Sequence, residues 1–230
     1  ENGSIDGGEF LDGFENGYFA GPKEPTGTVY HQYFTAIPVG TLLAQSWNLD
    51  LMKKLGQMIA GEMNEFEVTL WLAPGMSLHR NPLCGRNFEY YSEDPLLAGM
   101  MASAMTLGVQ SVPGCGTTIK HYACNNQEDN RMGSDSILSE RTLREIYLKG
   151  FEIAICNAQP MAMMTSYNLI NGVHAANNYD ICTKAVRDEW GFEGAIMTDW
   201  TTTTDSIAGE CTAAGCMKAG NDMVMPGDIR

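Results

Sequence analysis

The sequence predicts an α/β protein of the (β/α)8 TIM-barrel-like kind, irregular or incomplete within this chain. Apolar runs of strand length alternate with helical patterns, which is typical of parallel β-α units. Polar and aromatic residues follow several of these runs, as they do at the carboxyl ends of barrel strands. No strand is followed by the dinucleotide fingerprint G-x-G-x-x-G, so a doubly wound sheet is the weaker alternative. About five units can be counted, fewer than a closed barrel of this kind contains.

The first part of the chain changes from irregular sequence to regular elements. Residues 1–34 are rich in Gly, Asp, Glu and aromatic residues, so we expect an irregular segment ahead of a barrel domain spanning 35–230. Asn48 can cap a helix, because apolar residues recur at helical spacing after it. The run VTLWLAPG (68–75) then predicts a strand that ends in a turn.

The remaining elements continue this alternation. Asp94 followed by Pro95 is a helix cap followed by proline at the first helical position. Ser139 can cap a later helix, whose apolar residues lie on one face. After Asp94 the predicted elements are a helix to about Gly108, the strand TTIKH (117–121), the helix after Ser139, the strand MAMMTSY (161–167), the helix Asp180–Trp190, the strand GAIMTDW (194–200), the helix Asp205–Ala219 and the strand DMVMPG (222–227).

The charge balance narrows the classes of partner. The formal net charge is −14, from 28 acidic residues against 14 Lys and Arg. Nucleic acids and anionic membranes require clustered cations, so we expect neither as a partner. An uncharged substrate fits the balance better, although a surface whose charge only keeps the protein in solution explains it equally well.

The cysteine pattern bears on the compartment. The chain has seven cysteines, an odd number, without a C-x-x-C pair. Free thiols in a reducing compartment explain this pattern better than a disulfide framework, which favours the cytoplasm and leaves secretion open. The chain begins with Glu1 rather than Met, so we expect a processed chain or a piece of a longer one. No run approaches the roughly 18 apolar residues that a membrane span needs.

The leading catalytic candidate is Asp199, at the end of GAIMTDW. A carboxylate at a strand tip can attack the anomeric carbon of a sugar and form a covalent ester. Trp200 beside it could stack on the apolar face of a sugar ring. The alternative is that Asp199 only caps the following helix, and the spacing does not choose between the two.

Lys120 and His121, at the end of TTIKH, are suited to hydrogen bonding with sugar hydroxyls. They could equally be a solvated lysine beside a structural histidine. A third interpretation is a Schiff-base lysine, which can also lie at a strand end. The other histidines lack ligand spacing with any acid or thiol, so we expect neither a metal nor a cofactor.

Two further candidates lie in polar segments near the predicted strand tips. Arg86 in GRNFEYYSEDP could donate paired hydrogen bonds to vicinal hydroxyls, or form a salt bridge with Glu89 in its own loop. Tyr167 in TSYN could reach the nucleophile or be a half-buried core tyrosine. The serine elbow G-x-S-x-G is absent, which argues against an α/β-hydrolase.

Together, several motifs resemble the barrel domain of the family-3 glycoside hydrolases, in particular that of bacterial β-glucosidases. The resemblance runs from about Thr35 to Gly227 and rests on the segments LCGRNFEYYSEDP, IKHYACNNQEDNR, SERTLREIYLKGFE, MTSYNLINGVH, RDEWGFEGAIMTDW and AGNDMVMPG. It implies a retaining, exo-acting β-glucosidase that acts on a β-glucoside or oligosaccharide.

The resemblance also assigns residue roles. It implies that Asp199 is the nucleophile and that the side chains contacting the sugar are those of Arg86, Lys120, His121, Tyr167, Trp200 and Met164. The family's Asp-Gly-Pro motif has no counterpart, because FAGPKEP has alanine before Gly-Pro. Arg131, Asn125 and Asn126 are interpreted as loop scaffolding.

The resemblance implies that one catalytic group lies outside this chain. The family's general acid/base is usually a glutamate of a second α/β sandwich domain, which is missing here, so that domain is an expected partner. Glu89, Glu93 and Glu128 lie near the predicted face, but the sequence places none of them opposite Asp199. The alternatives are therefore a non-catalytic sugar-binding fragment or, less favoured, a β-xylosidase or a Schiff-base lyase.

Overall fold

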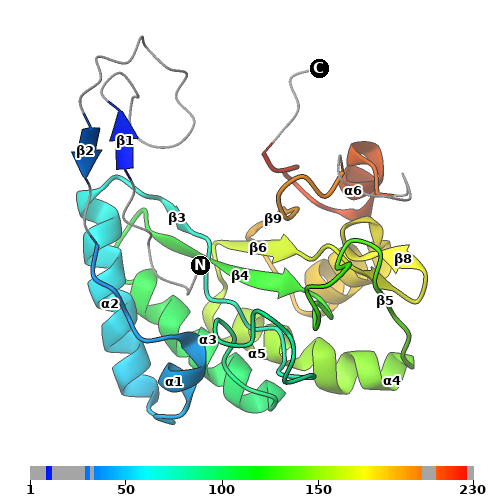
Figure 1. Cartoon of the computed structure of the whole chain (residues 1–230), viewed down its shortest axis with the longest axis horizontal. Helices are drawn as coiled ribbons and strands as arrows, with labels where there is room; N and C mark the ends of the chain where they lie inside the picture. Colours follow the sequence, from blue (N-terminus) through cyan, green and yellow to red (C-terminus); the bar gives the residue numbers. More distant parts are fainter. Residues whose placement is uncertain (1–8, 12–28, 32–33, 204–210, 227–230) are drawn as a thin grey trace.

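The computed structural model describes residues 9–11, 29–31, 34–203 and 211–226. Its central feature is a parallel sheet of four strands in the order β3-β4-β6-β9 (Figure 1). These strands are β3 (Leu70–Trp71), β4 (Gly116–Tyr122), β6 (Ala162–Thr165) and β9 (Ala195–Met197). Each strand pairs with the one that precedes it, and the order never reverses. A doubly wound sheet reverses its order, so this winding is that of a barrel.

The described strands form an open sheet rather than a closed barrel. The expected last strand, 222–227, is reduced to a single parallel bridge between Met223 and Met197, and Gly227 lies outside the described residues. The expected strand 68–75 is also shorter, because ladder pairing is confined to Leu70 and Trp71. The prediction of an incomplete barrel built from parallel β-α units is confirmed.

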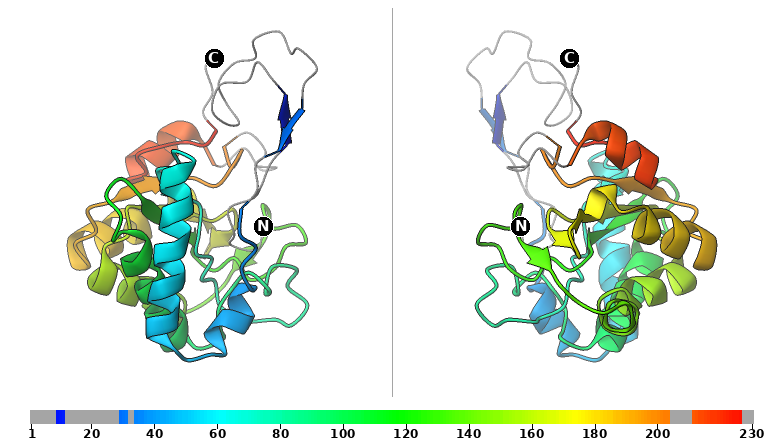
Figure 2. Two further views of the ribbon diagram at one scale, coloured as in Figure 1. Left: turned by 90° about the vertical axis from the view of Figure 1, so that its left-hand side faces the viewer. Right: turned by 90° about the vertical axis from the view of Figure 1, so that its right-hand side faces the viewer.

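Helices connect the strands. The longer ones are α2 (Leu49–Glu65), α3 (Pro95–Val109), α5 (Lys149–Ala158), the π-helical η3 (Asp180–Glu189) and α6 (Ala213–Ala219). The shorter ones are α1 (Gly40–Ala44), α4 (Glu140–Thr142), η1 (Leu143–Tyr147) and η2 (Ala175–Asn177). In the side views of Figure 2, most helices gather on one side of the sheet and the long loops project on the other.

The predicted helix starts are confirmed at three positions. The side chains of Asn48, Asp94 and Ser139 accept hydrogen bonds from the backbone N–H groups of Leu51, Leu96 and Thr142. Each cap satisfies a donor that the first helical turn leaves unpaired. The helix after Ser139 is divided, because the π-helical turn η1 separates α4 from α5.

Two predictions of secondary structure are wrong. The last helix does not begin at Asp205: Cys211 and Thr212 are not helical, and the Thr212 side chain caps α6 by accepting from the N–H of Gly215. Residues 204–210 lie outside the described part. Within the amino-terminal segment expected to be irregular, β1 (Glu9–Leu11) pairs antiparallel with β2 (Val29–His31).

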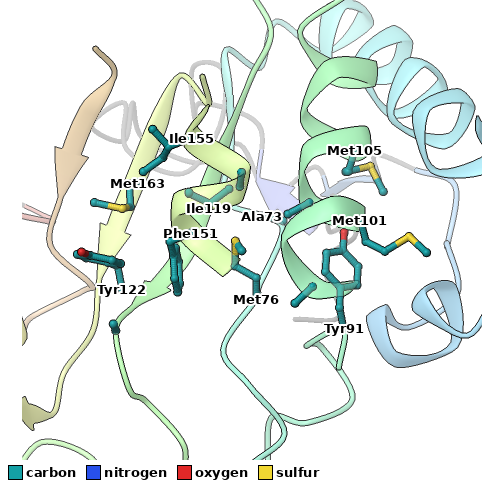
Figure 3. Packing of buried hydrophobic residues seen from close by; sticks show 14 of the residues in the cluster. Ala73, Met76, Tyr91, Met101, Met105, Ile119, Tyr122, Phe151, Ile155 and Met163 are labelled. Carbon is teal, nitrogen blue, oxygen red and sulfur yellow. The ribbon is translucent and has the colours of Figure 1, made fainter. Parts of the chain in front are cut away.

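Strand alternation gives the sheet two different faces. Residues on one face join the main hydrophobic core with the helices: Trp71, Ile119, Met163 and Ile196. The opposite face carries a separate apolar cluster without any helix residue: Ala162, Met164 and Met197, with Leu70, Leu72, Ala195 and Met225 packed against them. Figure 3 shows Met101 and Met105 of α3, and Phe151 and Ile155 of α5, beside Ile119 and Met163 of the sheet.

Close helix packing fixes the outer layer. Helices α2 and α3 approach each other where Gly56 faces Gly108, and a Cβ on Gly56 would lie 2.5 Å from the carbonyl oxygen of Met105. A Cβ on Gly108 would collide with the backbone carbonyl of Lys53. None of the helices in the described part of the chain is both long and apolar enough to cross a lipid bilayer.

A small second sheet lies in the loops that follow β4 and β6. It pairs β5 (Asp135–Ser136), β7 (Leu169–Ile170) and β8 (Val173–His174) in that order, with β7 and β8 joined as a hairpin. Because it bridges two neighbouring strand-to-helix loops, it holds them together at the carboxyl end of the main sheet.

Candidate active site

The predicted polar residues meet at the carboxyl ends of β4, β6 and β9. Lys120 and His121 lie on β4, Tyr167 follows β6 and Asp199 follows β9. Arg86 reaches them from the loop between β3 and α3. This is where a barrel enzyme places its catalytic groups, because all the strands open onto one face. Lys120, His121, Tyr167 and Asp199 are all buried, with exposed fractions of 2–5%.

Asp199 is held by one of its carboxylate oxygens only. Its Oδ1 accepts a hydrogen bond of 2.7 Å from the backbone N–H of Trp200. Its Oδ2 is buried and has no hydrogen-bond partner among the described residues. Its backbone carbonyl accepts from the Thr202 hydroxyl at 2.8 Å, which fixes the turn. A buried polar atom without a partner is uncommon and destabilising, and a role in binding or chemistry is one explanation for it.

The structure also bears on the alternative role of Asp199 as a helix cap. The residues directly after it, 200–203, form a turn, and α6 is capped by Thr212. Burial raises the pKa of Asp199, whereas the Trp200 N–H, Tyr167 and the positive charges of Arg86 and Lys120 lower it. Asp199 is therefore not the cap of α6, and the cations favour its ionised form against the effect of burial.

His121 faces Asp199. Its Nε2 lies 3.5 Å from Asp199 Oδ2, and its Nδ1 lies 3.0 Å from the hydroxyl of Tyr90. Burial, followed by the positive charges of Arg86, Lys120 and Arg131, holds the pKa of His121 well below its ordinary value. The imidazole is therefore neutral at physiological pH, with one N–H donor and one acceptor nitrogen.

Arg86 and Lys120 share a buried carboxylate, that of Glu89. The Arg86 guanidinium donates two hydrogen bonds to Glu89, from Nε at 2.8 Å and from Nη2 at 3.0 Å. The Lys120 ammonium lies 3.2 Å from Glu89 Oε1. The salt bridge within the loop is thus present, and it also orients Arg86 toward the site. An ion-paired lysine in this position is better suited to donating hydrogen bonds than to attacking a carbonyl.

Tyr167 and Trp200 are coupled through the backbone. The Tyr167 hydroxyl donates a hydrogen bond of 2.8 Å to the carbonyl oxygen of Trp200. Burial first, and then the neighbouring Asp199 carboxylate, raise the pKa of the Tyr167 phenol. Trp200 is half-buried, and its N–H is the donor to Asp199. Met164 lies on β6 beside Met197, in the apolar cluster of the sheet face that carries no helices.

The sequence interpretation missed three residues of the site. The Arg131 guanidinium lies 4.3 Å from the centroid of the Tyr167 ring and pairs with Glu128 at 2.8 Å, although Arg131 was expected to be scaffolding. Glu89 was expected as a partner of Arg86 and as a carboxylate near the predicted face, but not as a partner of Lys120. Tyr90, which contacts His121, was not among the candidates. The one signal available from the sequence was the Glu–Arg spacing of three residues at positions 128 and 131.

Metal ligation finds no support in the geometry. Within ranges 34–203 and 211–226 there is no cluster of three or more His, Cys, Asp or Glu side chains that could hold a metal ion. His79 and His174 contact backbone carbonyl oxygens, those of Tyr90 at 3.0 Å and Tyr167 at 3.2 Å.

Several known proteins are similar to this chain in sequence and in fold. β-Glucosidase A of Butyrivibrio fibrisolvens is 51% identical over 166 residues, which cover 72% of this chain and 20% of that protein. An exo-α-(1→6)-L-arabinopyranosidase of Bifidobacterium breve is 50% identical, over 72% of this chain and 22% of that protein. The structure of β-glucosidase 3B from Thermotoga neapolitana in complex with glucose is 48% identical and superposes with a TM-score of 0.80, over 90% of this chain and 27% of that one.

The chain thus spans only about a fifth to a quarter of the length of these relatives. The match to a family profile is more complete. Residues 23–229, nearly the whole chain, match the glycosyl hydrolase family 3 N terminal domain. Since this match spans most of the chain and the fold and the winding of the sheet agree with it, the chain belongs to glycosyl hydrolase family 3, as its N-terminal barrel-like domain.

Proposed function

We propose that this chain is the nucleophile-bearing domain of a retaining, exo-acting β-glucosidase, which releases terminal β-D-glucosyl residues through a covalent glycosyl-Asp199 ester. The observation that carries the proposal is the unpartnered, buried Oδ2 of Asp199 beside neutral His121. The His121 Nε2 contact with Oδ2, at 3.5 Å, does not meet hydrogen-bond geometry in this structure, so the lone pairs of Oδ2 stay available for attack. The names of the relatives support a glycosidase, and several of them are β-glucosidases.

The first step follows from the positions of the charges. Asp199 Oδ2 attacks the anomeric carbon, the glycosidic bond breaks, and the leaving oxygen takes a proton from a general acid. Meanwhile the Trp200 N–H holds Oδ1 and fixes the angle of attack. The positive charges of Arg86 and Lys120 favour the carboxylate before attack. In the second step water hydrolyses the ester, which restores Asp199 and releases the sugar with retained configuration.

Sugar binding is assigned to the donors around the nucleophile. Arg86 keeps N–H groups beyond the two that Glu89 accepts, since a guanidinium has five, and the Lys120 ammonium is a donor group held at the site by Glu89. We propose that these N–H groups and the His121 imidazole bind the hydroxyls of the terminal sugar. Tyr167, Trp200 and Met164 are proposed as further contacts of that sugar, with the Trp200 indole as a stacking wall.

The general acid is proposed to come from outside this chain. Retention requires a second carboxyl about 5 Å from the nucleophile. Glu89 is paired with Arg86 and Lys120, and Glu128 is paired with Arg131. Glu93 is exposed to solvent. None of the three is therefore suited to donate a proton at Asp199, and a glutamate of the family's α/β sandwich domain is the proposed donor.

Mechanism-based labelling tests this function. The full-length enzyme is incubated with a 2-deoxy-2-fluoro-β-glucoside that carries an activated leaving group, and the adduct is located by peptide mapping. An activated leaving group needs little acid assistance, so the label reports on the nucleophile. We expect one glycosyl adduct, on Asp199, and none in an Asp199→Asn variant. An adduct on another residue, or none in an enzyme that turns over aryl β-glucosides, would contradict the assignment.

The sugar itself has one rival, favoured by a specific observation. The arabinopyranosidases of Bifidobacterium are as similar to this chain as the glucosidases are. An arabinopyranose lacks the exocyclic hydroxymethyl group of glucose, so the two sugars differ where a specificity pocket can act. Comparing kcat/KM for aryl β-D-glucoside, β-D-xyloside and α-L-arabinopyranoside decides between them, and a preference for either pentose would replace glucose in the proposal.

A further inference from the structure

Tyr90 is a buried residue that contacts His121 on the side opposite the nucleophile. Its side chain is fully buried, and its ring meets the His121 ring edge-on, with 6.1 Å between the centroids. Its hydroxyl lies 3.0 Å from His121 Nδ1, and the Asn125 side-chain amide donates to the same hydroxyl oxygen at 3.5 Å. Its backbone carbonyl accepts from the Thr41 hydroxyl at 3.0 Å, which fixes the residue in place.

The hydrogen bonds determine which nitrogen of His121 carries the proton. A neutral imidazole has one N–H, and an ionised carboxylate can only accept. Because Nε2 faces Asp199 Oδ2, a proton on Nε2 gives an attractive contact, whereas a lone pair there would face the lone pairs of the carboxylate. Nδ1 must then accept a hydrogen bond. Tyr90 can supply it, since Asn125 donates to its oxygen and leaves the single hydroxyl hydrogen for Nδ1.

We propose that Tyr90 is a positioning residue, which holds His121 in the tautomer whose Nε2–H points toward Asp199 and the sugar. This inference rests on the proposed function and deepens it. Tyr90 touches neither the nucleophile nor the reacting atoms, and it acts only through His121. Its role is analogous to that of an outer partner which fixes the orientation and tautomer of a histidine whose other nitrogen is engaged.

The remaining charged groups around His121 fit this arrangement. Lys120 precedes it on β4, Arg86 enters from the loop before α3, and Arg131 enters from the loop after β4. All three are cations and disfavour the imidazolium, while Asp199 is the acid that faces the ring. Glu89 and Glu128 are each paired with one or more of these cations. The imidazole is therefore kept neutral, and the choice of tautomer is left to Tyr90 and Asp199.

The direct test reads the tautomer in the unaltered protein. The full-length enzyme is labelled with ¹⁵N-histidine, and the His121 signals are assigned by their absence in a His121→Asn variant. The proposal predicts a protonated, pyrrole-type Nε2 and an unprotonated, pyridine-type Nδ1 between about pH 6 and 8. An ordinary histidine changes its charge in this range. A protonated Nδ1 with unprotonated Nε2, or an imidazolium, overturns it. This measurement uses the wild-type enzyme, so it does not require a folded Tyr90 variant.

A double-mutant cycle tests whether Tyr90 acts through His121. Tyr90→Phe should lower kcat/KM by roughly 10- to 100-fold, the range expected when a buried hydrogen-bond partner is lost. In a His121→Asn background the same change should have little further effect on kcat/KM, because that variant has no imidazole for Tyr90 to orient. Tyr91→Phe is the matched control, since Tyr91 is the neighbouring buried tyrosine and packs in the hydrophobic core. Equal losses in both backgrounds would show a merely structural role and refute the proposal.

Labelling separates this inference from the proposed function. If the wild-type enzyme acquires the fluoroglucosyl adduct on Asp199 but Tyr90→Phe changes neither the rate of labelling nor kcat/KM, only the role of Tyr90 fails. If the wild-type enzyme acquires the adduct on another residue, the assignment of Asp199 as the nucleophile fails. The NMR measurement of the His121 tautomer then decides the role of Tyr90 independently. The loss in Tyr90→Phe should appear mainly in kcat if the Nε2–H contact strengthens in the transition state.

Discussion

Replacing Glu89 with glutamine should destabilise the protein strongly, because it leaves buried Lys120 and partly buried Arg86 without their shared anion. The Glu89 carboxylate lies 3.2 Å from the Lys120 ammonium and 2.7 Å from the Arg86 guanidinium. At an effective dielectric constant of about 20, one such pair attracts by about 5 kcal/mol. Part of that attraction only offsets desolvation, and removing one partner of a buried pair typically costs about 3–5 kcal/mol. We expect a loss in this range for Glu89→Gln.

Thermal unfolding of the full-length enzyme measures the effect. For domains of about 150–250 residues, each kcal/mol shifts Tm by about 2–4 °C, so the transition of this domain should fall by about 6–20 °C. Glu93→Gln is the matched control, since Glu93 lies in the same loop and is exposed; its Tm should change by less than about 2 °C. KM should also rise in Glu89→Gln, because Arg86 and Lys120 lose the group that orients them. A Tm within about 2 °C of wild type, with unchanged KM, would refute this reasoning.

Two further predictions concern Asp199, the proposed nucleophile, and the helix layer. Burial raises the pKa of Asp199, so the folded state binds its proton more tightly than the unfolded state, and the carboxylate becomes destabilising as pH rises through the folded pKa. Asp199→Asn should therefore abolish turnover yet raise Tm at neutral pH. The gain in Tm should shrink as pH falls toward the ordinary pKa of an aspartate side chain. A lower Tm at neutral pH would contradict this. Gly108→Ala places a Cβ against the Lys53 carbonyl and should cost about 1–3 kcal/mol in urea unfolding. Gly61→Ala, where the space is open, should stabilise α2 by up to about 1 kcal/mol, and equal effects of the two substitutions would rule out the close approach as the cause.

The local signals in the sequence were reliable where physical chemistry acts over a few residues. The caps at Asn48, Asp94 and Ser139 were predicted correctly, because a side chain that satisfies its own helix needs no distant partner. The strand β4 was also predicted, with the expected range 117–121 lying inside the observed Gly116–Tyr122. The last helix was placed too early because Asp205 is a plausible cap, whereas Thr212 makes the cap of α6.

The ends of the sheet were harder to predict than its centre. Strand pairing depends on a partner that is remote in sequence, so the apolar run 222–227 gave no sign that only Met223 would form a bridge. The run 68–75 likewise looked like a full strand, although only Leu70 and Trp71 pair in the ladder. The antiparallel pair of β1 and β2 was missed for the same reason, because its strands are short and far apart in the chain.

The sequence by itself determined that this is a chain of parallel β-α units with a carboxylate, two cations and an imidazole at the strand ends. Those properties follow from patterns and residue types. The sequence offered the Arg86–Glu89 pair within one loop, but only the tertiary structure added Lys120 to that pair and placed His121 between Tyr90 and Asp199. A pairing depends on distances between loops that leave different strands, and no spacing along the chain encodes those distances. For the same reason the structure alone could show that one oxygen of Asp199 is anchored while the other has no partner among the described residues.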